Sequence, residues 1–247
     1  MKTNSFENPS IVSPEKWLAA RQELLREEKE FTRLGDRLAA RRRELPWVKM
    51  KPYLFDSPRG KVTLADLFDG RRQLIVQHFM LGPGWEQGCK SCSFMMDHFN
   101  PTVLHLKARD VAFAAISHAP LADILPFKQR MGWAVNWVSS HGTDFNQDFS
   151  VSFTEEEIKR GSVYYNYHEM NFPQTEAPGI SVFARDSAGD IYHTYSTFGR
   201  GVEVVMTTYD LLDLVPKGRD EANDEYGMQW LRHHDRYEPA ADVVAAR

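Results

Sequence analysis

The two cysteines of this 247-residue chain lie three positions apart, in the stretch GPGWEQGCKSCSFMMDHF. A near-continuous apolar run, RQLIVQHFM (72–80), precedes the stretch and predicts a buried central strand. The segment SFMMDHF that follows the pair predicts a helix. Positions i and i+3 are neighbours on a helical turn, so Cys89 and Cys92 can form a disulfide without backbone movement. The spacing therefore favours a dithiol redox pair.

The two cysteines are expected to play different roles. Cys89 faces the unpaired N–H groups and the positive end of the predicted helix, which favour the thiolate over the thiol. Cys92 lies one turn inward, where it is shielded and can resolve a mixed disulfide that Cys89 forms. Gly88 removes side-chain bulk where the sulfur of a partner must approach. The predicted function is thiol–disulfide exchange on a thiol or disulfide substrate, either a protein or a small molecule.

Two other interpretations of the pair are weaker. One is that the cysteines are simply small buried apolar residues. The other is a metal site, because His98 and His105 extend the pattern to C-x2-C-x5-H-x6-H. The second gap is long for a zinc finger, and the predicted helix turns His98 away from the cysteines. We therefore expect neither a metal ion nor a cofactor.

Two further functions stay open at this stage. Peroxiredoxins carry a proline and then a threonine ahead of the reactive cysteine on a helix turn. Here Pro83 is one residue too close to Cys89, and Glu86 stands where the threonine is needed. A thiol-dependent peroxidase is therefore the second hypothesis. The third is a non-catalytic thioredoxin-like binding module that uses an aromatic-rich insertion at about 139–177 as its surface.

Composition narrows the classes of partner. The chain has 30 Lys and Arg against 34 Asp and Glu, and a net charge of −4 lacks the basic footprint of a nucleic-acid-binding protein. The N-terminus shows no basic segment followed by an apolar one, so no secretory signal is predicted. The longest apolar runs are too short to span a bilayer. We expect a cytoplasmic protein without a membrane partner, in a compartment that keeps thiols reduced.

Residues 13–45 predict one long helix with an apolar stripe. Ser13 can cap it, and Pro14 suits its first position. The stripe has a strict seven-residue spacing, and its members are Trp17, Leu24, Phe31, Leu38 and Leu45. The other faces carry many Glu, Arg and Lys residues. Such a helix packs on its own domain or on a second subunit, and a homodimer is the favoured outcome.

The predicted elements follow one another as strand, CxxC helix, strand, helix, hairpin and helix. This is the order of the thioredoxin fold, so we expect an α/β protein with a central mixed sheet flanked by helices. An N-terminal helical extension and an insertion before the C-terminal hairpin are added to it. The expected organisation is a helical arm at 1–46, a thioredoxin-like domain at 47–220 and a tail at 221–247.

Several blocks of the chain resemble a bacterial thioredoxin-like family of uncharacterised function, known mostly from genomes. The blocks include EKEFTRLGDRLAARRRELPWV, YLFDSPRGKVTLADLFDGRRQLIVQHFM, GCKSCSF, RMGW, WVSSHGTDFNQDF, PGISVFARD and HTYSTFGRG. Together they cover most of residues 17–220. The resemblance implies a thioredoxin-like fold with dithiol–disulfide oxidoreductase activity, and it supplies no substrate.

Three more residues are assigned from the likeness to thioredoxins. His78 stands in the place of their buried acid, which manages the proton of the inner cysteine, and an imidazole can do that work. A hydrogen-bonded core histidine is the alternative role for His78. Trp85 corresponds to the tryptophan before their first cysteine, although it lies four residues earlier. Pro178 matches their cis-proline, which implies a cis Ala177–Pro178 bond next to Cys89.

Overall fold

The computed structural model describes residues 9–222 and 227–237. Contacts between residues divide the chain into two compact units. One unit comprises Val48–Thr207 and Glu221–Arg247, and the other comprises Met1–Trp47 and Thr208–Asp220. The boundary predicted from the sequence lies at nearly the same residue, but the prediction places 208–220 in the thioredoxin-like domain and 221–247 in a tail. Of that tail, 223–226 and 238–247 lie outside the described residues.

The smaller unit contains the long helix that the sequence predicts. This helix, α1 (Pro14–Arg43), begins where the Ser13 side chain accepts a hydrogen bond from the backbone N–H of Lys16 at 3.4 Å. None of its residues is buried. The predicted apolar stripe is exposed along its length, from 40% at Leu38 to 77% at Phe31. The unit also holds most of α6 (Thr207–Leu214).

The exposed stripe of α1 supports the predicted pairing with a second copy of the chain. Large apolar side chains at seven-residue intervals on a charged helix are typical of a coiled-coil seam. We predict a homodimer, with a sedimentation mass of twice the 28.5 kDa of one chain at micromolar concentration. Replacing Phe31 by Glu should shift the mass to that of one chain. A wild-type mass of one chain at that concentration would contradict the prediction.

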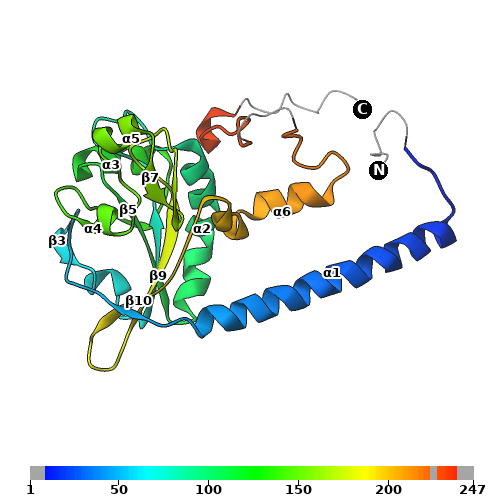
Figure 1. Ribbon diagram of the computed structural model, residues 1–247, viewed down its shortest axis with the longest axis horizontal. Helices are drawn as coiled ribbons and strands as arrows, with labels where there is room; N and C mark the ends of the chain where they lie inside the picture. The colour runs from blue at the N-terminus through cyan, green and yellow to red at the C-terminus, as the bar shows by residue number, and fades with distance from the viewer. Residues whose placement is uncertain (1–8, 223–226, 238–247) are drawn as a thin grey trace. The chain divides into compact units, whose positions relative to one another are not determined.

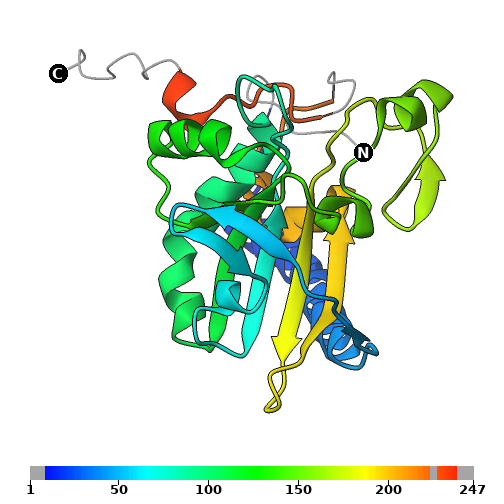
Figure 2. The same ribbon diagram turned by 90° about the vertical axis from the view of Figure 1, so that its left-hand side faces the viewer.

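The larger unit is built on an eight-stranded sheet with the order β1-β10-β9-β4-β5-β6-β2-β3. Its strands are β1 (Val48–Lys49), β2 (Leu54–Ser57), β3 (Gly60–Thr63), β4 (Gln73–His78), β5 (Val111–Ser117), β6 (Asn136–Ser139), β9 (Gly179–Arg185) and β10 (Ile191–Phe198). The strands β4, β5 and β6 run parallel, while β9 pairs antiparallel with β4 and with β10. Figure 2 shows the hairpin β9–β10, in yellow and gold, beside β4 in cyan.

Helices cover the sheet on both faces, and α2 and α4 lie on opposite sides of it (Figure 1). The helix α2 (Lys90–Lys107) packs on β5, where the rings of Phe99 and Phe113 stack 4.4 Å apart. The helix α3 (Leu121–Arg130) packs beside β6. The other face carries the 3-10 turn Asp66–Phe68 and α4 (Phe145–Asp148) over a large buried cluster. The expected α/β class with helices on a central mixed sheet is confirmed.

The expected insertion lies between the end of β6 and the start of β9. It contains α4, α5 (Glu155–Arg160) and a separate hairpin, β7 (Val163–Tyr165) with β8 (His168–Met170). Thr154 and Glu157 form a reciprocal capping box that starts α5. The insertion ends in an extended segment where Phe153 and Ala177 donate backbone hydrogen bonds to Thr175 and Val151. Among the described helices, none combines the length and apolar character needed to cross a bilayer.

Candidate active site

The structure places the cysteine pair at the start of α2, directly after the central strand β4. Cys89 is the N-cap residue and is half-buried, whereas Cys92 is 1% exposed. The segment that follows β4 (residues 79–82, the strand extension) hydrogen-bonds to both of them. The backbone N–H of Cys89 donates to the Met80 carbonyl at 3.0 Å, and the N–H of Met80 donates to the Cys92 sulfur at 3.5 Å. Both cysteines are free thiols.

Local contacts shift the pKa values of the two thiols in opposite directions. A hydrogen bond from the Cys92 side chain, aided by backbone N–H groups of Cys92 and Ser91, lowers the pKa of Cys89 to about 6. Burial raises the pKa of Cys92 above its ordinary value. At neutral pH the outer sulfur is therefore mainly thiolate, while the inner one stays protonated and donates to it. A thiolate is the nucleophilic form of cysteine.

Gly88 is required by packing within the protein rather than by the approach of a partner sulfur. A Cβ atom at this position would lie 2.5 Å from the Phe79 ring and 2.7 Å from the Phe127 ring. Gly88 is itself buried, so it does not open space for an incoming substrate. The glycine lets the loop before Cys89 press against two aromatic rings, which sets the position of the N-cap.

His233 holds the same loop from the far end of the chain. Its Nε2 donates to the Gly88 carbonyl at 2.8 Å, and Arg130 donates to its Nδ1 at 2.7 Å. This arrangement fits a neutral ring, whose pKa is lowered chiefly by burial. His233 is 2% exposed and its neighbour Leu231 is fully buried, so this stretch of the expected tail belongs to the larger unit. The contact between His233 and Gly88 could not be predicted, because no local pattern links residue 233 to residue 88.

The structure does not bring His78 to the cysteines. Successive residues of a strand point to opposite faces, and it is Gln77 whose side chain donates to the Cys92 carbonyl at 3.0 Å. His78 points the other way, onto Ser181 at 2.7 Å and against the Phe145 ring. Burial lowers the pKa of His78 to about 3, so it is a neutral core histidine. The neutral amide of Gln77 cannot exchange a proton with Cys92.

The predicted cis bond before Pro178 is wrong, because every peptide bond between the described residues is trans. The hairpin itself is where the sequence predicts it, with Gly179 opposite His78. The reason for the trans bond lies in the insertion, whose extended pairing with Ala177 leads straight into β9 without a turn. The N–H of Ala177 is consequently used by Val151 and is not available to an incoming peptide.

Trp85 lies beside Gly82. Its indole nitrogen is 3.2 Å from the point that a Cβ on Gly82 would occupy, and Cγ of Glu176 is 3.1 Å from the same point. Gly82, in the loop that carries Trp85, therefore lies against Glu176. This carboxylate was not singled out by the sequence.

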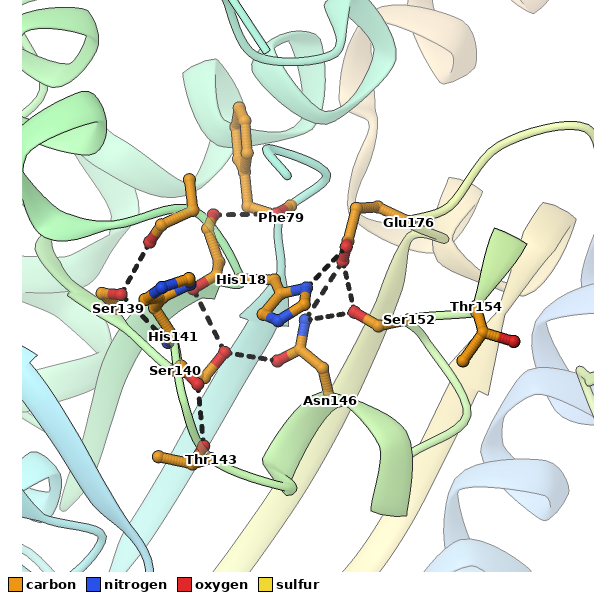
Figure 3. Close-up of polar contacts among 12 residues, drawn as sticks. Phe79, His118, Ser139, Ser140, His141, Thr143, Asn146, Ser152, Thr154 and Glu176 are labelled. Atoms are coloured by element: carbon orange, nitrogen blue, oxygen red, sulfur yellow. Dashed lines mark hydrogen bonds and ion pairs between the residues drawn. The ribbon is translucent and has the colours of Figure 1, made fainter. Parts of the chain in front are cut away.

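Glu176 is the centre of a buried polar cluster at the carboxyl ends of the parallel strands (Figure 3). It accepts hydrogen bonds from Ser152, from Asn146 at 3.3 Å and from Nδ1 of His118 at 2.9 Å. His118 follows β5 directly, and its ring lies near that of His141, which follows β6 closely. The sequence contains one signal for His118 and His141, since each follows a predicted or observed parallel strand and the carboxyl ends of such strands meet at one edge of a sheet.

In the described part of the chain, no group of three or more His, Cys, Asp or Glu side chains is placed to hold a metal ion. The site is thus defined by two thiols at a helix N-terminus and, along the same edge of the sheet, by a carboxylate–imidazole pair. These groups can act as a nucleophile, a resolving thiol and a proton donor.

A parallel βαβ unit with two thiols at the helix start, followed by an antiparallel hairpin, defines a thioredoxin-like protein. Similar solved structures include peroxidoxin BcpB from Mycobacterium tuberculosis, with 10% identity over 66% of this chain and 95% of that chain and a TM-score of 0.45. A putative protein disulfide isomerase from Bacteroides thetaiotaomicron has 14% identity over 67% and 91% and a TM-score of 0.37.

The chain belongs to the family described as "bacterial protein of unknown function (DUF899)", which matches it over residues 6–237. The expected membership of an uncharacterised bacterial thioredoxin-like family is confirmed. No curated protein matches the chain.

Proposed function

We propose that the protein is a thiol–disulfide oxidoreductase that works through Cys89 and Cys92. The observation that carries the proposal is the asymmetry of the pair. Cys89 is a half-buried helix N-cap with a pKa of about 6, and Cys92 is a buried thiol that hydrogen-bonds to it from one turn inward. We place the reaction in the cytoplasm, where thiols are available as reductants.

The proposed reaction has two steps. The Cys89 thiolate attacks one sulfur of a substrate disulfide, forms a mixed disulfide and releases the other sulfur, which takes up a proton. Cys92 then loses its proton and attacks the Cys89 sulfur, which forms the Cys89–Cys92 disulfide and releases the second substrate thiol. The substrate disulfide is reduced to two thiols, and the protein dithiol is oxidised by two electrons.

The experiment that tests this proposal is the pH dependence of alkylation by iodoacetamide. We expect the rate at Cys89 to rise through pH of about 6 and to level off by about 8, because the pKa is lowered and only the thiolate reacts. A free cysteine would show a midpoint near 8.5. The midpoint is the sharper readout, because a thiolate of low pKa is also less nucleophilic.

The same samples should form an intramolecular disulfide under mild oxidant, with a mass loss of two hydrogens that dithiothreitol reverses. Cys92 serves as the internal control, since its buried, protonated sulfur should alkylate slowly across this range. Equal, slow alkylation of both cysteines without disulfide formation would remove the proposal and favour the binding-module alternative.

A thiol-dependent peroxidase is the second candidate, because the same thiolate and resolving thiol suit it. Cys89 would take one oxygen from a peroxide ROOH, giving a sulfenic acid and ROH, and Cys92 would then form the disulfide with release of water. Peroxide consumption coupled to thioredoxin or dithiothreitol separates the two activities. Rapid reduction of disulfides with negligible peroxide consumption is the outcome we expect.

A further inference from the structure

Thiol–disulfide exchange needs a proton for the leaving sulfur, and the neighbours of the cysteines on β4 do not supply one. Gln77 is a neutral amide, and His78 faces the other side of the sheet with a lowered pKa. The carboxyl edge of the sheet does contain an ionisable pair, His118 with Glu176, to which the proposed function assigns no role.

The carboxylate of Glu176 is held in one orientation by three donors. Its Oε2 accepts from the Ser152 hydroxyl and from Nδ2 of Asn146 at 3.3 Å, and its Oε1 faces Nδ1 of His118 at 2.9 Å. The Asn146 amide is itself oriented, because its Oδ1 accepts from Ser140 at 2.7 Å. Glu176 is 2% exposed, so this network presents a fixed buried acceptor to the imidazole.

His118 has one nitrogen available to a substrate. Its side chain is 23% exposed, and within residues 9–222 and 227–237 no hydrogen-bond partner is recorded for its Nε2. The titratable groups that face the ring in the described part are Glu176 and the neighbouring His141. The hydrogen bond to Glu176 raises the pKa of His118 and so favours the doubly protonated ring. Carboxylate-oriented imidazoles of this kind serve as general acids and bases.

The strand extension after β4 links this pair to the cysteines. Met80 hydrogen-bonds to both cysteines, Leu81 accepts from the N–H of Ala119 next to His118, and Gly82 lies against Glu176. Met80 and Gly82 are two residues apart, which is at most about 7 Å of chain. The thiols and the imidazole therefore border the same edge of the sheet.

We infer that His118 is the general acid that protonates the leaving sulfur when Cys89 attacks a disulfide, and that Glu176 is its positioning residue. The inference rests on the proposed function. The new bond joins the Cys89 sulfur to one substrate sulfur, and the S–S bond of the substrate breaks. The departing thiolate takes the proton from Nε2 of His118 and leaves as a thiol. The neutral ring, still bonded to Glu176, regains a proton from solvent.

The test compares two substrates with the full-length Cys92→Ser protein, in which only the first step occurs. A dialkyl disulfide releases a basic thiolate that needs a proton, whereas 5,5′-dithiobis(2-nitrobenzoate) releases a weakly basic one that does not. We expect His118→Gln to slow the dialkyl reaction at least tenfold at pH 7 and to change the aromatic reaction less than twofold. Tenfold is below the usual gain from general acids, because thiolates are fairly good leaving groups.

Two controls separate this role from a structural one. His141→Gln removes the neighbouring imidazole and should leave both rates unchanged. Alkylation of Cys89 by iodoacetamide releases iodide, which needs no proton, so His118→Gln should not change it. An equal loss with both disulfides, or no loss with either, would overturn the inference. Failure of the proposed function gives a different result. The Cys92→Ser protein with His118 intact would then react with neither disulfide, and the inference would fall with the proposed function.

The pH profile provides a second readout. With the dialkyl substrate, the rate should rise as Cys89 ionises and fall at higher pH as His118 loses its proton. His118→Gln should lack the falling limb. Glu176→Gln removes the negative charge that raises the pKa of His118, so its falling limb should move to lower pH. An unchanged limb in Glu176→Gln would contradict the positioning role.

Discussion

Replacing Cys89 by Ser should reduce disulfide exchange by at least about 10³-fold, since a serine hydroxyl is not ionised near neutral pH and the reaction loses its nucleophile. The loss should persist from pH 6 to pH 9, because the other thiol, Cys92, is buried and its pKa is raised. Release of thiol from a model disulfide, measured in a single turnover, checks this result. The fold should survive, because Cys89 is only half-buried and Ser is a favoured N-cap residue.

The matched variant is Cys92→Ser, which removes the other sulfur of the same turn. Its hydroxyl can still donate to the Cys89 thiolate, so the first attack should proceed. Resolution should not, and a mixed disulfide with the substrate should accumulate and survive non-reducing electrophoresis. This variant can therefore capture protein substrates from cell extract for identification by mass spectrometry. Turnover of Cys92→Ser at the wild-type rate would show that the two cysteines do not act as a pair.

The buried cluster around Glu176 should be the most sensitive point for stability. In Asn146→Asp, an oxygen replaces the nitrogen that now lies 3.3 Å from Oε2 of Glu176. Two carboxylates would then face each other in a site where both residues are nearly fully buried. We expect a loss of about 3–5 kcal/mol in the free energy of unfolding at pH 7, the usual cost of leaving a buried charge uncompensated.

The loss in the free energy of unfolding should shrink on acidification, because it comes from two ionised carboxylates that repel each other. Like charges raise the pKa of one carboxyl in the folded variant above the value of about 4 in the unfolded chain. The penalty is therefore complete above the raised pKa and disappears as pH falls toward about 4. Urea unfolding of wild type and variant at pH 5 and pH 8 measures the difference.

Asn100→Asp provides the control for that experiment. Asn100 uses its Oδ1 to accept the N–H of Ala134 at 2.8 Å, and an aspartate keeps that acceptor. Its cost should stay below about 1 kcal/mol and vary little with pH. A similar small cost for Asn146→Asp would mean that water reaches the cluster and screens the two charges.

Most of the scaffold could be predicted from the sequence because its signals are local. The N-cap and periodicity of residues 13–45 predict a helix, and the apolar run at 72–80 predicts the buried strand that precedes the cysteines. Ser187-Ala188-Gly189 is a local hairpin-turn signal, and the structure places the turn of the β9–β10 hairpin there, between Arg185 and Ile191. Each signal depends on neighbours within a few positions, so no knowledge of packing was needed.

Residue assignments that depended on alignment to another fold were less secure. Moving one position along β4 exchanges the two faces of the sheet, which is why Gln77 rather than His78 meets Cys92. The cis-proline depended on a turn before β9, and the insertion replaced that turn with an extended pairing. Neither difference could be seen in the local pattern.

The sequence by itself determined that the two cysteines lie together, because residues at i and i+3 on a helix start are brought together by helical geometry alone. Only the tertiary structure decided what surrounds them. His118 and Glu176 are 58 positions apart, and His233 and Gly88 are 145 apart. Such contacts form when strands, insertion and C-terminal segment pack together, since burial then forces each polar group to find a partner wherever in the chain it lies.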